Sequence, residues 1–173
     1  MTSLDLSRLS GPDAVSALRS YPRRYRSAVL PVPDDPDAEE LATRIAPSGH
    51  SALELVVNTA SSWVLIGRAL HQVLIDHEPV LHPAVADAAE REWEVPPGTT
   101  VVTALERLDD EATALADALE RVHGAEWNRI GRVAGAAPTD QAITALDLAK
   151  TAVSTGSDNL HRVDATLASL RPR

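Results

Sequence analysis

The sequence predicts an all-α protein that folds as a four-helix bundle in a single domain, residues 1–173. Four long segments repeat apolar residues at steps of three and four, which is the period of a helix packed on one face. No segment shows a competing alternation of apolar and polar residues, the period of a strand. A chain of 173 residues is also long enough to bury one compact core. The long helices are expected over residues 13–29, 52–77, 99–123 and 139–170.

The first two helices carry different local signals. The first is expected from Asp13 to Val29, with Pro22 inside it as a residue that kinks or divides a helix. A short helix is expected over residues 37–45. The second long helix begins after Ser51, because Ser51 and Glu54 fit a capping box, in which each side chain bonds the other residue's backbone amide. It is apolar on nearly every side, which predicts a central position.

The last two helices follow a connection that contains four prolines, residues 78–98. The third helix is expected to end at Gly124, a residue type that commonly caps helix C-termini. The fourth is expected to run unbroken from about Thr139 past Val163, roughly 40 Å at 1.5 Å per residue. Gly156 lies on its apolar face and is expected to allow close helix contact.

Composition limits the class of function. The net charge of −9 argues against nucleic acid as a partner, since phosphates require a basic surface. The absence of cysteine excludes disulfides, thiolate metal sites and a cysteine nucleophile. The first 30 residues do not resemble a signal peptide, and no apolar run is long enough to span a membrane. We therefore expect a soluble, cytoplasmic protein.

Short motifs in a fixed order point to a family. The chain contains in succession ALRSYPRRYRSAV, SALE, AEWNRIGRV and ITALDLAKTAVSTGSDNLHRVDATL. In this order they resemble the first helix, the stretch before the first metal histidine, the Trp-bearing link and the last helix of the DinB-like superfamily. That superfamily includes the mycothiol-dependent transferases and maleylpyruvate isomerases, and the likeness is strongest to actinobacterial members. The resemblance implies a DinB-like four-helix bundle and leaves a homodimer open.

The resemblance also implies where a metal would be held. In the family, one histidine of the second helix and two histidines at i and i+4 of the fourth bind a divalent metal. Carried over by position, these ligands become Asn58, Ser154 and Asp158, and none is histidine. Two neutral side chains and one carboxylate are a poor ligand set for zinc or nickel. We therefore expect no tightly held metal, no cofactor, and a pocket at the former metal position.

Four polar residues of the fourth helix form one stripe. Thr151, Ser154, Asp158 and His161 follow one another at steps of three, four and three. As a site, the stripe would provide Asp158 and His161 for acid–base catalysis, and Thr151 and Ser154 for substrate binding. The same spacing is also typical of a solvated helix face, and Asp158 with His161 of a surface ion pair.

Residues outside the fourth helix also belong to the candidate site or offer alternatives to it. Asn58 lies among apolar neighbours, so it is expected to be buried and hydrogen-bonded to a polar group of another helix. The resemblance would supply Ser154 and Asp158 as these partners. Trp93, in the Pro-rich connection, is expected to line a ligand cavity. The arginines within residues 19–26 could hold an anion, but such a cluster is more typical of a solvated face. One carboxylate facing the pocket favours neutral or cationic ligands over anions.

The sequence leaves three functions open. One is a metal-independent enzyme that acts on a small organic molecule, in detoxification or specialised metabolism, with Asp158 as its acid or base. Another is a non-catalytic protein that binds or sequesters a small molecule in the same pocket. A thiol-dependent transferase that retains a metal is the third, and the ligand set disfavours it. The lack of an activated nucleophile favours binding, whereas the resemblance favours the enzyme.

Overall fold

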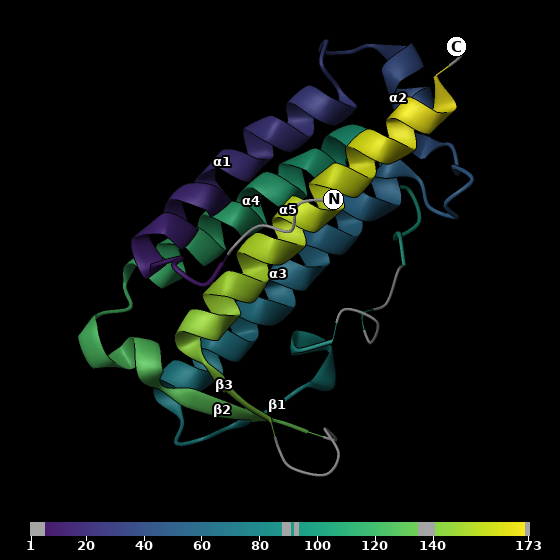
Figure 1. The fold of residues 1–173 in the computed structure, drawn as a ribbon. Coiled ribbons are helices and arrows are strands. Elements are labelled where there is room, and N and C mark those ends of the chain that lie inside the picture. The colour runs from purple at the N-terminus through teal and green to yellow at the C-terminus, as the bar shows by residue number, and fades with distance from the viewer. Residues whose placement is uncertain (1–5, 88–90, 92–93, 135–140, 172–173) are drawn as a thin grey trace.

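Four long helices form the body of the protein (Figure 1). The computed structural model describes residues 6–87, 91, 94–134 and 141–171. The long helices are α1 (Gly11–Val29), α3 (Ala52–Ile75), α4 (Val101–Glu120) and α5 (Ala145–Leu170). Both α1 and α3 pack against α4 and α5, so α1 and α3 occupy opposite corners of the bundle. This arrangement confirms the expected all-α four-helix bundle.

Shorter elements complete the fold, with α2 near one end of the bundle and the strands near the other (Figure 1). The helical ones are α2 (Pro36–Thr43), η1 (Pro83–Val85) and η3 (Gly124–Asn128), and the strands are β1 (Val80–Leu81), β2 (Ile130–Val133) and β3 (Gln141–Thr144). The three strands form a small sheet beside the start of α5, with β2 in the middle, parallel to β1 and antiparallel to β3. The sequence pattern did not predict this sheet, because strands of two to four residues are too short to show a period.

The last helix begins later than expected. It begins at Ala145 instead of near Thr139, because residues 141–144 pair with β2; residues 139 and 140 lie outside the described ranges. Thr144 is the N-cap: its backbone amide and hydroxyl both donate to Asp147 Oδ2, and the Asp147 amide donates back to Thr144 Oγ1 at 3.0 Å. From there α5 continues without a break through Gly156 to Leu170.

The other helix boundaries largely agree with the prediction. The capping box of α3 is present, with the Ser51 amide donating to Glu54 Oε2 at 2.7 Å and the Glu54 amide donating to Ser51 Oγ at 3.1 Å. Pro22 does not divide α1, which runs as one helix. The third long helix ends at Glu120, before Gly124, which has a φ of 52° and begins η3.

Three aromatic side chains fix α5 against the rest of the core. The hydroxyls of Tyr21 and Tyr25 donate to the carbonyls of Val153 and Gly156, at 2.9 and 2.8 Å. The indole of Trp63 donates to a neighbouring α5 carbonyl at 3.0 Å. All three rings are buried. Because these bonds reach backbone atoms of one helix, they set its rotation and so determine which of its faces points away from the core.

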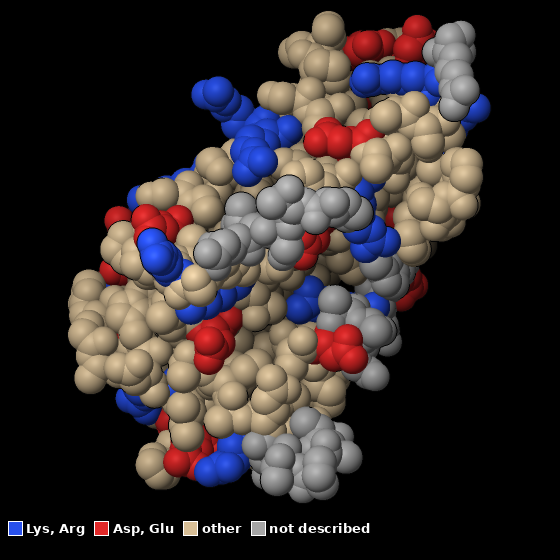
Figure 2. All heavy atoms as spheres, viewed as in Figure 1, with Lys and Arg blue, Asp and Glu red and all other residues tan. Residues whose placement is uncertain are grey.

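The surface carries charges of both signs. Figure 2 shows acidic and basic side chains interspersed over one face of the molecule. The four arginines within residues 19–26 are exposed, as expected of a solvated face, and Arg19 pairs with Asp117 at 3.0 Å and Glu120 at 2.7 Å on α4. None of the helices in the described part of the chain has the length and apolar character that a membrane crossing needs.

Candidate functional site

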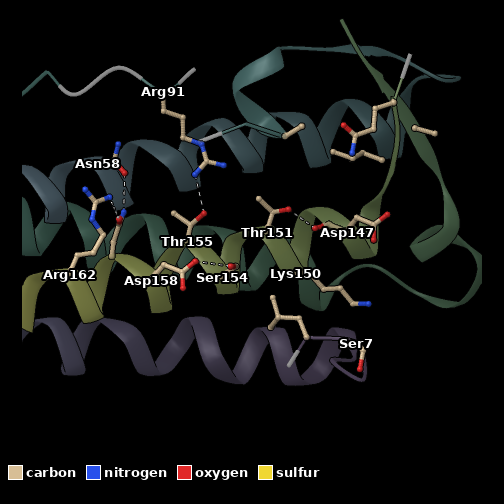
Figure 3. Close-up of a pocket in the computed structure, with 16 residues that line it drawn as sticks. Ser7, Asn58, Arg91, Asp147, Lys150, Thr151, Ser154, Thr155, Asp158 and Arg162 are labelled. Carbon is tan, nitrogen blue, oxygen red and sulfur yellow. Dashed lines mark hydrogen bonds between the residues drawn. The ribbon is translucent and has the colours of Figure 1, made fainter. Parts of the chain in front are cut away.

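A cavity of about 890 Å³ runs along α5 and receives most of the predicted site residues. Asn58 from α3 and Thr151, Ser154 and Asp158 from α5 all line it (Figure 3). Ser154 and Thr151 are half-buried, whereas Asp158 is exposed. The polar stripe of α5 therefore faces a hollow between helices over much of its length, and not only bulk solvent.

Two other candidates are not placed in this cavity. His161 is exposed and does not line it, although it follows the same stripe. Trp93 lies outside the described residues. His82 lines an adjoining cavity of about 400 Å³, and its Nδ1 accepts a hydrogen bond from the Ala84 amide at 3.1 Å. His77 is exposed and lines neither of these cavities.

Asn58 is buried, but its partner differs from the expected one. Asn159 Nδ2 donates to Asn58 Oδ1 at 2.9 Å and to Thr59 Oγ1 at 3.0 Å. The Thr59 hydroxyl in turn lies 3.0 Å from the Tyr25 hydroxyl. The expectation that Ser154 and Asp158 bond Asn58 was therefore wrong. The amide of Asn159 connects α3 to α5 beneath the cavity, and within the described chain no buried polar side-chain atom lacks a partner.

Asp158 bonds the residue one turn before it. Ser154 Oγ donates to Asp158 Oδ2 at 3.0 Å (Figure 3). Among the described residues this is the hydrogen bond that the Asp158 side chain makes, so His161 is not its partner. The structure thus presents a carboxylate with an adjacent hydroxyl at the mouth of the cavity, and not the expected Asp–His pair.

Arg91 is a member of the site that the sequence did not reveal. Its guanidinium is buried in the cavity wall, where Nε donates to the Ala84 carbonyl at 2.9 Å. Its Nη1 donates to the hydroxyls of Ser62 at 3.3 Å and Thr155 at 3.0 Å. Burial lowers the pKa of Arg91, and the negative charge of Asp87 opposes that shift. Arg91 therefore connects η1 with α3 and α5, and it lines both cavities.

The charge of the cavity is mixed. Arg91, Lys150 and Arg162 line it together with Asp147 and Asp158. Figure 3 shows Lys150 and Arg162 on opposite sides of the Ser154–Asp158 pair along α5. The expectation that neutral or cationic ligands would be favoured took Asp158 as a lone carboxylate. That premise is wrong, because Asp147 is a second carboxylate in the lining and three basic residues line the cavity as well.

The residues at the family's metal positions do not fit a zinc or nickel site. Asn58 Oδ1 already accepts from Asn159, and the Ser154 hydroxyl donates to Asp158. Asp158 remains as a single exposed carboxylate, and such metals usually need three or four nitrogen, sulfur or carboxylate ligands. In the described ranges no group of three or more His, Asp or Glu side chains could hold a metal ion.

Comparison with known proteins identifies the fold. No family model and no curated protein sequence matches the chain. A solved structure does match: YfiT from Bacillus subtilis, described as a probable metal-dependent hydrolase with an unusual four-helix bundle topology. The TM-score is 0.64 at 16% identity, over 98% of this chain and 89% of YfiT. The likeness shows the fold, a four-helix bundle, and leaves the activity to be argued from the site.

Proposed function

We propose that this protein binds a small organic molecule in the 890 Å³ cavity beside α5 and does so without a metal. The observation that carries the proposal is the convergence of Asn58, Thr151, Ser154 and Asp158 from two helices on one hollow. A volume of this size lies within the roughly 300–1,000 Å³ that small-molecule sites occupy.

The chemistry of the lining supports binding. The hydroxyls of α5, the Asn58 amide and the charged groups offer both donors and acceptors to a ligand. Beneath them, the buried network of Asn58, Asn159, Thr59 and Tyr25 holds the two helices in one arrangement. Polar groups held in place by such a network lose little freedom when a ligand binds, which favours affinity.

The test is to fill the cavity. Ser154→Phe places a ring in the hollow, whereas His161→Phe places the same ring on the exposed surface of the same helix. Benzoate, benzamide and benzamidinium share one ring and differ in charge, so together they probe the cavity broadly. We expect at least one of them to shift NMR signals of α5 amides in the unchanged protein and in His161→Phe, but not in Ser154→Phe. Equal binding to both variants, or no shift at α5, would refute the proposal.

Catalysis is the second candidate, and the Ser154–Asp158 hydrogen bond favours it. A carboxylate oriented by a neighbouring hydroxyl is a suitable general base for activating water. Hydrolysis is the reaction class that the description of YfiT suggests. If Asp158 acts in this way, Asp158→Asn lowers the rate of phenyl acetate hydrolysis about 10²-fold while the cavity still binds benzamide. Hydrolysis at an unchanged rate removes Asp158 from catalysis and leaves the binding proposal in place.

A further inference from the structure

We propose that the ligand enters the cavity with an anionic group, a carboxylate or a phosphate, which Arg91 and Lys150 hold from two walls. This inference rests on the proposed binding function and specifies the class of its ligand. It reverses the preference for neutral or cationic ligands over anions that the sequence suggested.

The first support is the position of Arg91. Its side chain is 9% exposed, and burying a charge is costly unless an opposite charge or strong hydrogen bonds compensate. Its hydrogen bonds within the described chain go to neutral acceptors, the hydroxyls of Ser62 and Thr155 and the carbonyls of Ala84 and Val85. Asp87 contributes a favourable charge from an exposed position. An anion in the cavity would supply compensation at closer range.

The hydrogen-bonding capacity of Arg91 is not fully used. A guanidinium has five N–H groups, and the described acceptors engage four of them. Two of those bonds are long, 3.3 Å to Ser62 Oγ and 3.4 Å to the Val85 carbonyl, compared with the usual range of about 2.7–3.2 Å. Among the described residues, one N–H of Arg91 has no acceptor and two are weakly engaged, so a stronger acceptor could use them. Carboxylate and phosphate oxygens are the acceptors that match this fork best.

The second support is Lys150. Lys150 lines the cavity from α5 and is half-buried, and its side chain makes no hydrogen bond or ion pair with any residue in the described ranges. Arg91 and Lys150 come from different segments, and Figure 3 shows them on opposite sides of the hydroxyls of Thr151 and Thr155. A ligand lying along these hydroxyls would have a cation on each side.

The acidic lining residues oppose an anion less than their number suggests. Asp147 accepts two hydrogen bonds through Oδ2, at 3.0 Å from the Thr144 amide and 2.6 Å from its hydroxyl, and it caps the positive end of α5. Asp158 is exposed and accepts from Ser154, so solvent screens much of its charge. The buried charge in the wall is that of Arg91, and it is positive.

The experiment compares ligands of one shape and different charge. Benzoate, phenylphosphonate, benzamide and benzamidinium are titrated into the full chain, and affinities are taken from NMR shifts of α5 amides. We expect benzoate or phenylphosphonate to bind at least about tenfold more tightly than benzamide, the factor that one charge-assisted hydrogen bond provides. The stronger of the two anions identifies the carboxylate or the phosphate class. Equal affinity for all four, or tighter binding of benzamidinium, overturns the anion inference but keeps the binding function; no binding at all refutes that function.

Variants test the two cations separately. Lys150→Gln and Arg91→Gln should each weaken benzoate binding about tenfold or more and leave benzamide binding unchanged. Arg107→Gln, at an exposed arginine of α4 outside the cavity, is the matched control. Circular dichroism checks folding, because Arg91 also connects η1 to the bundle. If Arg91→Gln does not fold, Arg91→Lys serves in its place. It keeps the positive charge but removes the planar guanidinium with its paired N–H donors, and it should still weaken benzoate binding. The assignment would be overturned if Lys150→Gln and the folded Arg91 variant both bound benzoate as tightly as Arg107→Gln does.

Discussion

A methyl group added at Gly156 is expected to destabilise the protein by a mechanism that the structure defines closely. An alanine Cβ at this position would lie 2.8 Å from Tyr21 Cε2 and 2.9 Å from Trp63 Cζ2. Ordinary contact begins at 3.4 Å, so the rings would have to retreat by about half an ångström. Both rings are fully buried and bonded to carbonyls of α5. Their retreat would therefore stretch these hydrogen bonds.

Two destabilising contributions and one stabilising contribution set the expected change in the free energy of unfolding. Overpacking a well-packed core by one methyl group costs about 1–3 kcal/mol. A weakened buried hydrogen bond adds about 1 kcal/mol, while replacing glycine by alanine inside a helix recovers about 1 kcal/mol. We therefore expect Gly156→Ala to lower the free energy of unfolding by about 1–3 kcal/mol, which is a fall in Tm of roughly 2–12 °C for a chain of this length.

Gly67 provides the matched control. It lies inside α3, and a Cβ there would meet only Leu115 Cδ1, at 3.8 Å. Gly67→Ala should thus raise the free energy of unfolding by up to about 1 kcal/mol. Urea unfolding of both variants, followed by circular dichroism and tryptophan fluorescence, measures the difference. If Gly156→Ala proves as stabilising as Gly67→Ala, the packing argument for α5 is refuted.

Three further outcomes are expected. The contribution of Tyr21 and Tyr25 to stability should be constant below about pH 10 and fall above it, because burial raises the pKa of both in the folded chain. Above the tyrosine pKa of the unfolded chain, only the folded state keeps these protons. Urea midpoints on both sides of about pH 10 check the sign, and Tyr25→Phe should give a shallower fall. Asn159→Leu should lower the free energy of unfolding by about 1–3 kcal/mol, because it leaves buried acceptors unpaired. Adding Asn58→Leu should recover part of this loss in a double-mutant cycle, whereas additive losses would contradict the network. Protein purified without chelator should hold far less than one equivalent of zinc or nickel by elemental analysis, and a retained equivalent would contradict the reading of the ligand set.

The fold was predictable because its signals are local. Apolar periods place the long helices, and the pair Ser51 and Glu54 marks the start of α3 in the sequence as in the structure. The start of α5 was misplaced because the strand before it is too short to interrupt the helical period. The spacing of Thr144 and Asp147 matches a capping box, and it is the local signal from which the true boundary could have been found.

The site was predictable only where helix spacing and the family resemblance apply. These place Asn58, Ser154 and Asp158, and the cavity receives all three. Asn159 was missed because it follows Asp158 directly, about 100° around the helix, and its role depends on a contact with another helix. Arg91 was missed because it lies in an irregular, Pro-rich connection with no period, so that only tertiary contacts define its place.

The contacts between α3 and α5 explain how a cavity can persist at the position that the sequence resemblance assigns to a metal. A metal with ligands on both helices would also cross-link them. Here the Asn58–Asn159 hydrogen bond, at 2.9 Å, and the Trp63 indole bond to α5, at 3.0 Å, provide that cross-link in the buried layer beneath the cavity. Positive charge comes from Arg91 and Lys150 in the walls. The residues that cross-link the helices are therefore not the residues that carry the positive charge. Lys150→Gln removes charge without touching the cross-link, so this variant tests the anion proposal in an intact bundle with an intact cavity.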